Sequence, residues 1–464
     1  MKMIIECFLL ATIFIVLIYS RSFLDHEFYV NRKIGNPIPS TEISRRKENI
    51  GYHQFQNSTR GKSPSRPLTS YVVNVDNFGA AANGSDDTQA FMKAWEKACC
   101  TRGSILLVPE KKEYHLKQII FEGPCESGIT VRIQGNITAS KDKSDFQKDP
   151  KFWIKFQNLT NFTVDGGGVI IGNGHVWWSK SCKLNKKQPC VRAPTALLFS
   201  NCTNLKVMLI QIENAQQMHL KFLGCENVEV SNLKIKSPGK SPNTDGIHVT
   251  GSTNVQILNS EIGTGDDCIS IVNGSYNIRA MGIKCGPGHG ISIGSLGKDG
   301  DEDQVANVLV SEATFTRTSN GVRIKSWQGG RGYAKNIVFQ NIKMQNVMNP
   351  IIIDQFYCNK EQRCKLQKNG VHVENVLYKN ITGTSASREG VILQCSETFP
   401  CEGVKLQNVQ IYHNGRNSSA SCSNVNVLEL GTNTPQCSSK EPGKIRRYRK
   451  KRKTKHNQED NHQS

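Results

Sequence analysis

Acidic and imidazole side chains recur at nearly equal intervals in the middle of the chain. Asp245 lies in the segment SPNTDGIHV, the pair Asp266-Asp267 lies in IGTGDDCISI, and His289 lies in CGPGHGISIG. If successive repeats stack, the three carboxyl groups lie close together and repel one another, so at least one of them keeps a proton near neutral pH. A protonated and an ionised carboxyl group are the acid and the base that hydrolysis of a glycosidic bond requires.

Cationic and aromatic side chains follow the acidic cluster in later repeats. Arg323 and Lys325 lie in GVRIKSWQGG, and Tyr357 lies in NPIIIDQFYC. An arginine and a lysine beside a groove can hold a carboxylate-bearing sugar through charge-assisted hydrogen bonds. Taken singly, an Asp-Asp pair after glycine is typical of a turn or a calcium ligand, and a histidine between glycines is typical of a turn. Their shared spacing is what favours a catalytic site.

A repeated strand pattern explains how these residues could be stacked. Each repeat has an asparagine, an apolar residue, a polar residue and then an alternating strand rich in valine and isoleucine. From Asn204 to Asn336 the successive intervals between these asparagines are 23, 27, 23, 30 and 29 residues, within the range of known solenoid repeats. The asparagines of the clearest repeats are Asn161, Asn204, Asn227, Asn254, Asn277, Asn307 and Asn336.

Short strands at this period, without helices between them, predict an all-β fold: a single right-handed parallel β-helix. Weaker repeats continue to about Cys437. A leucine-rich repeat has a similar period, but the leucine and asparagine skeleton of that repeat does not match this pattern. Residues one coil apart should then lie about 4.8 Å apart on neighbouring strands, so the acidic cluster should line one groove.

An amphipathic helix is predicted just before the repeats. After the strand pattern that begins near Tyr71, apolar residues recur at helical spacing, and Asp86 or Asp87 could cap the N-terminus of the helix. We expect this short helix to close the N-terminal end of the sheet structure. Its apolar face consists of Phe91, Ala94, Trp95 and Ala98.

Composition divides the chain into four segments. Residues 1–20 predict a signal peptide because Lys2 precedes an apolar run, with an uncleaved membrane anchor as the alternative. Residues 21–69 are polar and contain several prolines, which indicates a linker or pro-segment. Residues 70–438 hold the repeats and form the expected catalytic domain, and residues 439–464 are expected to be a basic, disordered tail.

The charge balance indicates a polyanionic partner. The 464 residues are 37% hydrophobic and 21% charged, which excludes global disorder and a collagen-like fibre. Of the formal net charge of +20, the segment from Lys440 to Ser464 carries +7, from ten Lys and Arg against three Asp and Glu, and the rest of the chain carries the remaining +13. A basic tail can serve as a nuclear signal or a nucleic-acid arm, but in a secreted chain we expect it to bind acidic polysaccharide or to be trimmed.

The 16 cysteines favour an oxidising compartment. Removal of Cys7 with the signal would leave 15, so at least one thiol should stay unpaired, among Cys99, Cys100, Cys125, Cys202 and Cys225. The predicted disulfides are Cys182/Cys190, Cys358/Cys364, Cys395/Cys401, Cys422/Cys437 and Cys268/Cys285. The sequence also contains N-glycosylation triplets, of which we expect only some to be used. They begin at Asn57, Asn83, Asn136, Asn158, Asn161, Asn201, Asn273, Asn380 and Asn417.

These motifs together resemble the plant polygalacturonases of glycoside hydrolase family 28, in particular the endo-acting enzymes of abscission and dehiscence. The resemblance runs from about Val73 to Cys437. It is carried by Asn243-Thr244-Asp245, Gly265-Asp266-Asp267, Gly288-His289-Gly290 and Arg323-Ile324-Lys325.

The resemblance implies hydrolysis of α-1,4-galacturonosyl bonds in de-esterified pectin with inversion. It implies that Asp266 is the general acid, that Asp245 and Asp267 activate water, and that His289 maintains the protonation of the acid. It also implies that galacturonate is bound by Asn243, Arg323, Lys325 and Tyr357. The one-coil spacing itself is closer to the carboxylate separation of retaining enzymes, so inversion rests on the resemblance alone.

We expect no cofactor and no metal. The expected partner is pectin or polygalacturonate; we expect no nucleic-acid partner, no membrane association after signal removal and a monomer in the cell wall. Three alternatives stay open: exo action, a lyase that uses calcium at the acidic pair, and a wall protein that binds pectin without cutting it.

Overall fold

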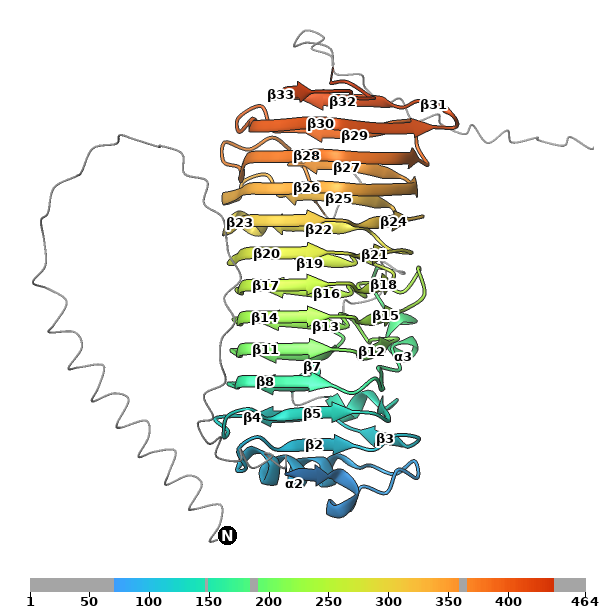
Figure 1. The fold of residues 1–464 in the computed structure, drawn as a ribbon. Coiled ribbons are helices and arrows are strands. Elements are labelled where there is room, and N and C mark those ends of the chain that lie inside the picture. Colours follow the sequence, from blue (N-terminus) through green and yellow to red (C-terminus); the bar gives the residue numbers. More distant parts are fainter. Residues whose placement is uncertain (1–70, 147–148, 184–190, 359–364, 438–464) are drawn as a thin grey trace, which may run out of the picture.

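The computed structural model describes residues 71–146, 149–183, 191–358 and 365–437, which form one elongated stack of coils (Figure 1). The predicted signal peptide (residues 1–20), linker (21–69) and basic tail (439–464) lie outside the described residues. Within the described ranges, no helix combines the length and the apolar character needed to span a membrane.

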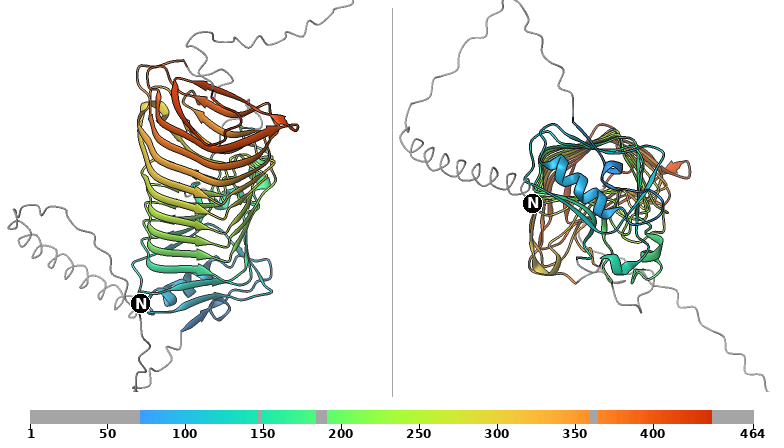
Figure 2. Two further views of the ribbon diagram at one scale, coloured as in Figure 1. Left: turned by 45° about the horizontal axis from the view of Figure 1, so that its top comes forward. Right: turned by 90° about the horizontal axis from the view of Figure 1, so that it is seen from below.

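Two sheets run along the stack (Figures 1 and 2). The smaller has eleven strands: β4 Ile119–Glu122, β7 Phe152–Gln157, β10 Thr195–Ser200, β13 Leu220–Leu223, β16 Ile247–Thr250, β19 Ile269–Ile271, β22 Ile291–Leu296, β25 Asn320–Ser326, β27 Asn349–Asp354, β29 Glu389–Gln394 and β32 Ser419–Ser423.

The larger sheet has 22 strands and bends where short strands follow longer ones. They are β1 Val72–Asn74, β2 Ile105–Val108, β3 Glu113–Leu116, β5 Thr130–Ile133, β6 Asn136–Ala139, β8 Thr160–Asp165, β9 Val169–Ile171, β11 Thr203–Met208, β12 Gln211–Glu213, β14 Glu226–Ser231, β15 Lys234–Lys236, β17 Thr253–Leu258, β18 Glu261–Gly263, β20 Ser275–Met281, β21 Lys284–Cys285, β23 Glu302–Ser311, β24 Thr314–Thr316, β26 Arg331–Val347, β28 His372–Ser385, β30 Cys401–His413, β31 Arg416–Asn417 and β33 Val425–Leu430. The described helices are α2 Thr88–Cys99 and α3 His175–Trp178, with 3-10 turns η1 Val75–Phe78, η2 Lys143–Phe146 and η3 Lys298–Gly300.

Residues one coil apart pair directly across parallel strands. Leu205 in β11 pairs with Val228 in β14, which pairs in turn with Val255 in β17. Among the described strand pairs, only the β30–β31 hairpin is antiparallel. The right-handed parallel β-helix predicted from the repeat is therefore confirmed, and the leucine-rich alternative was wrong.

The repeated asparagine bends the chain at the start of a strand in each coil. Asn254 has φ 58°, a left-handed conformation that asparagine tolerates better than most residues. Its Nδ2 donates to Oδ1 of Asn227 at 3.0 Å, and its Oδ1 accepts from Nδ2 of Asn277 at 3.0 Å. Equivalent bonds form an asparagine ladder along Asn161, Asn204, Asn227, Asn254, Asn277, Asn307, Asn336 and Asn375.

The predicted N-terminal helix is α2, which lies across the end of the stack (Figure 2, right). The N-cap residue of the helix is Asp87, whose side chain makes no capping hydrogen bond, but Oδ1 of Asp86 accepts from the backbone N of Thr88, the first helical residue, at 3.0 Å. Asp87 instead accepts from the backbone N of Ala81 at 2.7 Å and holds the preceding loop. The predicted apolar face is buried: Phe91, Ala94, Trp95 and Ala98.

Stacked aromatic rings join α2 to the interior of the β-helix. The Trp95 ring centroid lies 5.1 Å from that of Phe121. Phe121 stacks on Phe156 at 4.8 Å, Phe156 on Phe199 at 5.3 Å, and Phe199 on Phe222 at 5.6 Å. Because side chains in register repeat on every coil, one type of residue can form a continuous row in the core.

Three predicted disulfides are present, and a fourth bridge links Cys99 to Cys125. Two of the candidates for an unpaired thiol, Cys202 and Cys225, are free and buried. For two other predicted pairs, Cys190 and Cys364 lie outside the described residues. The confirmed bridges are Cys268–Cys285, Cys395–Cys401 and Cys422–Cys437.

We expect Asn254→Ala to destabilise the protein more than Asn254→Gly. Both variants lose the two ladder hydrogen bonds, but only alanine must also adopt the left-handed backbone conformation, at a cost of about 1 kcal/mol. Urea-induced unfolding followed by fluorescence would measure the difference. Equal stability of the two variants would show that backbone conformation does not explain the repeated asparagine.

Candidate active site

The predicted site residues lie at the start of consecutive strands of the smaller sheet. Ile247 in β16 pairs with Ile269 in β19, Ile269 with Ile291 in β22, and Ile291 with Val322 in β25. Asp245, Asp267 and His289 each precede these paired residues by two positions, so the structure brings them to one edge of adjacent coils. The predicted stacking is therefore confirmed.

A glycine is required where the acidic pair begins. A Cβ atom on Gly265 would lie 1.9 Å from the carbonyl oxygen of Ser241, so no other residue fits without moving the loop of the preceding coil. The backbone N of Gly265 donates to Oγ1 of Thr244 at 3.0 Å. This contact ties the loop that carries Asp245 to the loop that carries Asp266.

Asp267 is buried and bound by two cations. Its Oδ1 accepts from Nη2 of Arg323 at 2.7 Å and from Oγ of Ser292 at 2.7 Å, and its Oδ2 accepts from Nζ of Lys325 at 2.9 Å. Burial opposes ionisation, but the charges of Lys325 and Arg323 outweigh it and hold the pKa of Asp267 well below its usual range. Asp267 is therefore a carboxylate throughout the mildly acidic range.

Asp245 is buried in a less cationic environment. Its Oδ2 accepts from Oγ of Ser270 at 2.7 Å and lies 3.5 Å from Nδ1 of His248. Burial, followed by the negative charge of Asp266, raises the pKa of Asp245. The expectation that one carboxyl group of the cluster has a raised pKa is met at Asp245, whereas the resemblance assigned the acid role to Asp266.

Asp266 is paired with His289. Oδ1 of Asp266 lies 2.9 Å from Nδ1 of His289 and also accepts from the backbone N of Asp267 at 2.8 Å. The hydrogen bond with Asp266 is the main cause of a raised pKa at His289. The imidazole therefore keeps its proton to higher pH than an isolated histidine would.

Of the predicted sugar-binding residues, Arg323 and Lys325 contact the acidic cluster directly, through Asp267. The Lys325 Nζ atom lies 5.3 Å from the ring centroid of Tyr357, and the Tyr357 ring meets Trp327 edge-on at 5.8 Å. Asn243 lies two residues before Asp245 in the same loop, with φ 54°. Tyr357, the prediction with the least distinctive motif, is thus placed beside the lysine.

The sequence reasoning missed three residues that contact the aspartates. Ser270, Ser292 and His248 occupy equivalent outward positions of adjacent strands in the smaller sheet. In the sequence they look like ordinary polar residues of alternating strands. The signal that could have found them is their position three residues after Asp267, His289 and Asp245, respectively.

One group of three side chains in the described ranges could surround a cation. Donor atoms of Asp266, Asp267 and His289 lie within 4.8 Å of one another. Both oxygens of Asp267 already bind the side chains of Arg323 and Lys325. A divalent cation there would face two fixed positive charges, so this donor set fits a calcium-dependent lyase poorly.

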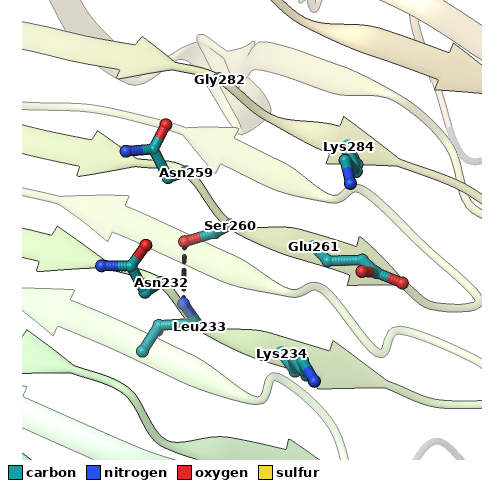
Figure 3. A pocket seen from close by; sticks show the side chains of 8 residues that line it. All are labelled: Asn232, Leu233, Lys234, Asn259, Ser260, Glu261, Gly282 and Lys284. Atoms are coloured by element: carbon teal, nitrogen blue, oxygen red, sulfur yellow. Dashed lines mark hydrogen bonds between the residues drawn. The ribbon is translucent and has the colours of Figure 1, made fainter.

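A hollow on the larger sheet has no connection with this cluster. Figure 3 shows its polar lining and the hydrogen bond that the backbone N of Leu233 donates to Oγ of Ser260, at 3.2 Å. Its lining residues are Asn232, Leu233, Lys234, Asn259, Ser260, Glu261, Gly282 and Lys284. None of them is a predicted site residue.

Comparison with known families gives the class of this enzyme. Residues 99–437 match the model of "Glycosyl hydrolases family 28", which is most of the chain. The chain belongs to this family. It is therefore a glycoside hydrolase, and the predicted family resemblance is confirmed.

Relatives of this family 28 enzyme include plant polygalacturonases. Polygalacturonase QRT2 of Arabidopsis thaliana is 52% identical over 397 residues, which cover 83% of this chain and 90% of that protein. Polygalacturonase-2 of Solanum lycopersicum is 52% identical over 373 residues, which cover 80% of this chain and 81% of that protein. The solved structure of a polygalacturonase from Erwinia carotovora has a TM-score of 0.65 and 25% identity, covering 80% of this chain and 100% of that one.

We expect Asp267→Asn to destabilise this family 28 enzyme by roughly 3 kcal/mol, because Arg323 and Lys325 lose their charged partner. Since the folded state lowers the pKa of Asp267, this stabilisation is fully present above the ordinary aspartate pKa of about 4 and is lost only as pH falls through the lower folded value. The difference from the wild type should therefore persist at about pH 5. Urea unfolding at that pH measures it.

Asp266→Asn is the matched control for this measurement. Asp266 is adjacent in sequence, but its partner is His289 rather than Arg323 or Lys325. Its substitution should change the free energy of unfolding less. If the two variants lose the same stability, the two ion pairs of Asp267 do not hold the site together.

Proposed function

We propose that this family 28 enzyme hydrolyses α-1,4-galacturonosyl bonds of de-esterified pectin. The observation that carries the proposal is the juxtaposition of an ionised carboxylate, a carboxyl–imidazole pair and two cations on adjacent coils. The names of the plant relatives and the net charge of +20 support a polygalacturonate substrate.

Asp266 is the proposed general acid. It is the more exposed carboxyl group of the acidic pair, with 20% side-chain exposure against 2% for Asp267, so it is the one that a polymer can reach. His289 holds a proton against its Oδ1 and can restore the proton that Asp266 gives to the leaving oxygen. This pairing supports the role that the resemblance gives to His289.

Asp245 and Asp267 are the proposed bases that activate water. Asp267 is the permanent carboxylate, whereas the raised pKa of Asp245 allows it to take up a proton during turnover. Inversion is proposed on the family resemblance alone, and it requires the water to approach the sugar from the side opposite to Asp266.

The substrate carboxylate is proposed to bind at Arg323 and Lys325. A guanidinium group has five N–H donors, and Nε and Nη2 of Arg323 contact Ser292 and Asp267, which leaves further donors for a ligand. Tyr357 places its ring beside Lys325, and Asn243 lies in the loop of Asp245. These four residues form the proposed galacturonate contacts.

We propose an endo-acting, secreted, monomeric enzyme that loosens the cell wall during cell separation. The four described disulfides favour an oxidising compartment. Residues 70–438 are the proposed catalytic domain. The basic tail of residues 439–464 is proposed to hold the enzyme on acidic polysaccharide, an association that salt should weaken.

We expect Asp266→Asn to lower kcat on polygalacturonate by at least about a hundredfold, because the leaving oxygen loses its proton donor. Binding of polygalacturonate and the unfolding midpoint should change little. Initial rates of reducing-end release, together with pull-down on insoluble pectate, would measure both. Full activity in this variant would exclude Asp266 as the acid.

We expect the wild type to lower the viscosity of polygalacturonate steeply while releasing few reducing ends, with chelator present. Internal cuts shorten a polymer far more per bond than cuts at the end. Reducing ends without viscosity loss would mean exo action, and an unsaturated, ultraviolet-absorbing product would mean elimination. Binding without either signal would favour the wall protein that binds pectin without cutting it.

A further inference from the structure

Two serines occupy equivalent positions in adjacent coils, and each holds one buried aspartate. Ser270 in β19 pairs in register with Ser292 in β22. Oγ of Ser270 donates to Oδ2 of Asp245 at 2.7 Å, and Oγ of Ser292 donates to Oδ1 of Asp267 at 2.7 Å. Each aspartate comes from the coil before its serine, so the same contact occurs twice, displaced by one coil.

Each serine then contacts a nitrogen donor of a third side chain. The single hydroxyl proton of serine is used on the aspartate, so the hydroxyl oxygen is free to accept. Nδ1 of His248 lies 2.7 Å from Oγ of Ser270, and Nε of Arg323 donates to Oγ of Ser292 at 3.0 Å. His248, Ser270, Ser292 and Arg323 form one row in register across β16, β19, β22 and β25.

The two ends of this row differ in charge. Arg323 is always protonated and also pairs directly with Asp267 at 2.7 Å. His248 can be neutral or charged, and its Nδ1 lies 3.5 Å from Oδ2 of Asp245. The opposite pKa shifts of Asp245 and Asp267 agree with this difference.

We propose that His248 and Ser270 are the positioning pair of Asp245: the Ser270 hydroxyl and the His248 imidazole stabilise its ionised form, as Ser292 and Arg323 do for Asp267 one coil later. The inference rests on the proposed hydrolysis, in which Asp245 must be ionised to activate water. His248 and Ser270 act through Asp245.

The other charged groups near Asp245 act on it differently from His248. The negative charges of Asp266 and Asp267 raise the pKa of Asp245. Lys221 pairs in register with His248 from β13 and interacts with Asp245 through its charge, but within the described residues no ion pair joins the two, whereas Nδ1 of His248 lies 3.5 Å from the Asp245 carboxylate.

One more imidazole touches the loop of Asp245. Nδ1 of His219 lies 3.0 Å from the backbone oxygen of Asp245. Burial lowers the pKa of His219 to about 4, so this ring stays neutral at mildly acidic pH. His248 is therefore the imidazole that can supply positive charge to the Asp245 carboxylate.

We expect His248→Gln to move the acidic limb of the kcat/KM profile to higher pH by about 0.5–1 unit. Glutamine can still donate to Ser270 but carries no charge, so the ionised form of Asp245 loses stabilisation and its pKa rises. Ser270→Ala should move the limb in the same direction. Polygalacturonate hydrolysis measured across pH would test both variants, with unfolding midpoints as the check on folding.

Ser292→Ala is the matched control. It removes the equivalent hydroxyl one coil away, but Asp267 keeps its contacts with Arg323 and Lys325, so the acidic limb should stay in place even if the rate falls. An unshifted limb in His248→Gln would overturn the proposal. So would equal shifts in Ser270→Ala and Ser292→Ala, because the effect would then be a general structural one.

A measurement that needs no catalytic turnover tests this proposal independently of the proposed hydrolysis. In ring-labelled protein, Asp245→Asn should shift the His248 resonance, assigned by its loss in His248→Gln, because the imidazole loses the carboxylate 3.5 Å from its Nδ1. The resonance of His289, which is paired with Asp266, should change less. An unchanged His248 resonance would disprove the pairing, whereas a wild type without hydrolysis would disprove only the proposed function.

Discussion

The parallel register between coils is the constraint on which the rest of the structure depends. Backbone hydrogen bonds fix neighbouring coils about 4.8 Å apart, so a side chain at one position of a coil always meets its counterpart in the next. In the interior this produces rows such as Phe121, Phe156, Phe199 and Phe222. On the surface it produces the asparagine ladder. On the smaller sheet it brings Asp245, Asp266, Asp267 and His289 together.

The same register creates an electrostatic difficulty and also its solution. Carboxylates on adjacent coils repel, and burial raises the cost of charging them. The next coil supplies Arg323 and Lys325, which stabilise the charge of Asp267, the most buried of the three carboxyl groups. Asp266 shares a hydrogen bond with His289, and Asp245 is left with Ser270 and a more distant His248. Three chemically identical side chains thereby acquire three different environments.

Much of this arrangement was predictable because, in a solenoid, residues one repeat apart in the sequence lie next to each other on adjacent coils. The repeated asparagines predicted the coils, and the nearly equal intervals from Asp245 to Asp266 and from Asp266 to His289 predicted that the site motifs would stack. The helix α2 followed from an apolar face that includes Phe91 and Trp95. The contacts of Ser270, Ser292 and His248 did not follow, because polar residues in alternating strands are common and nothing local marks one that bonds to an aspartate of another coil.

The repeat and the spacing of the motifs are enough to predict the fold, the family motifs and the set of side chains that meet, because strand periodicity and backbone pairing act over one coil. The division of charge among these side chains becomes visible only in the folded chain. The pKa of Asp245 is raised and that of Asp267 is lowered, although both are aspartates at equivalent positions of adjacent coils. The reason is physical: burial and the distance to a cation depend on side-chain placement at the scale of a hydrogen bond, which no spacing in the sequence specifies.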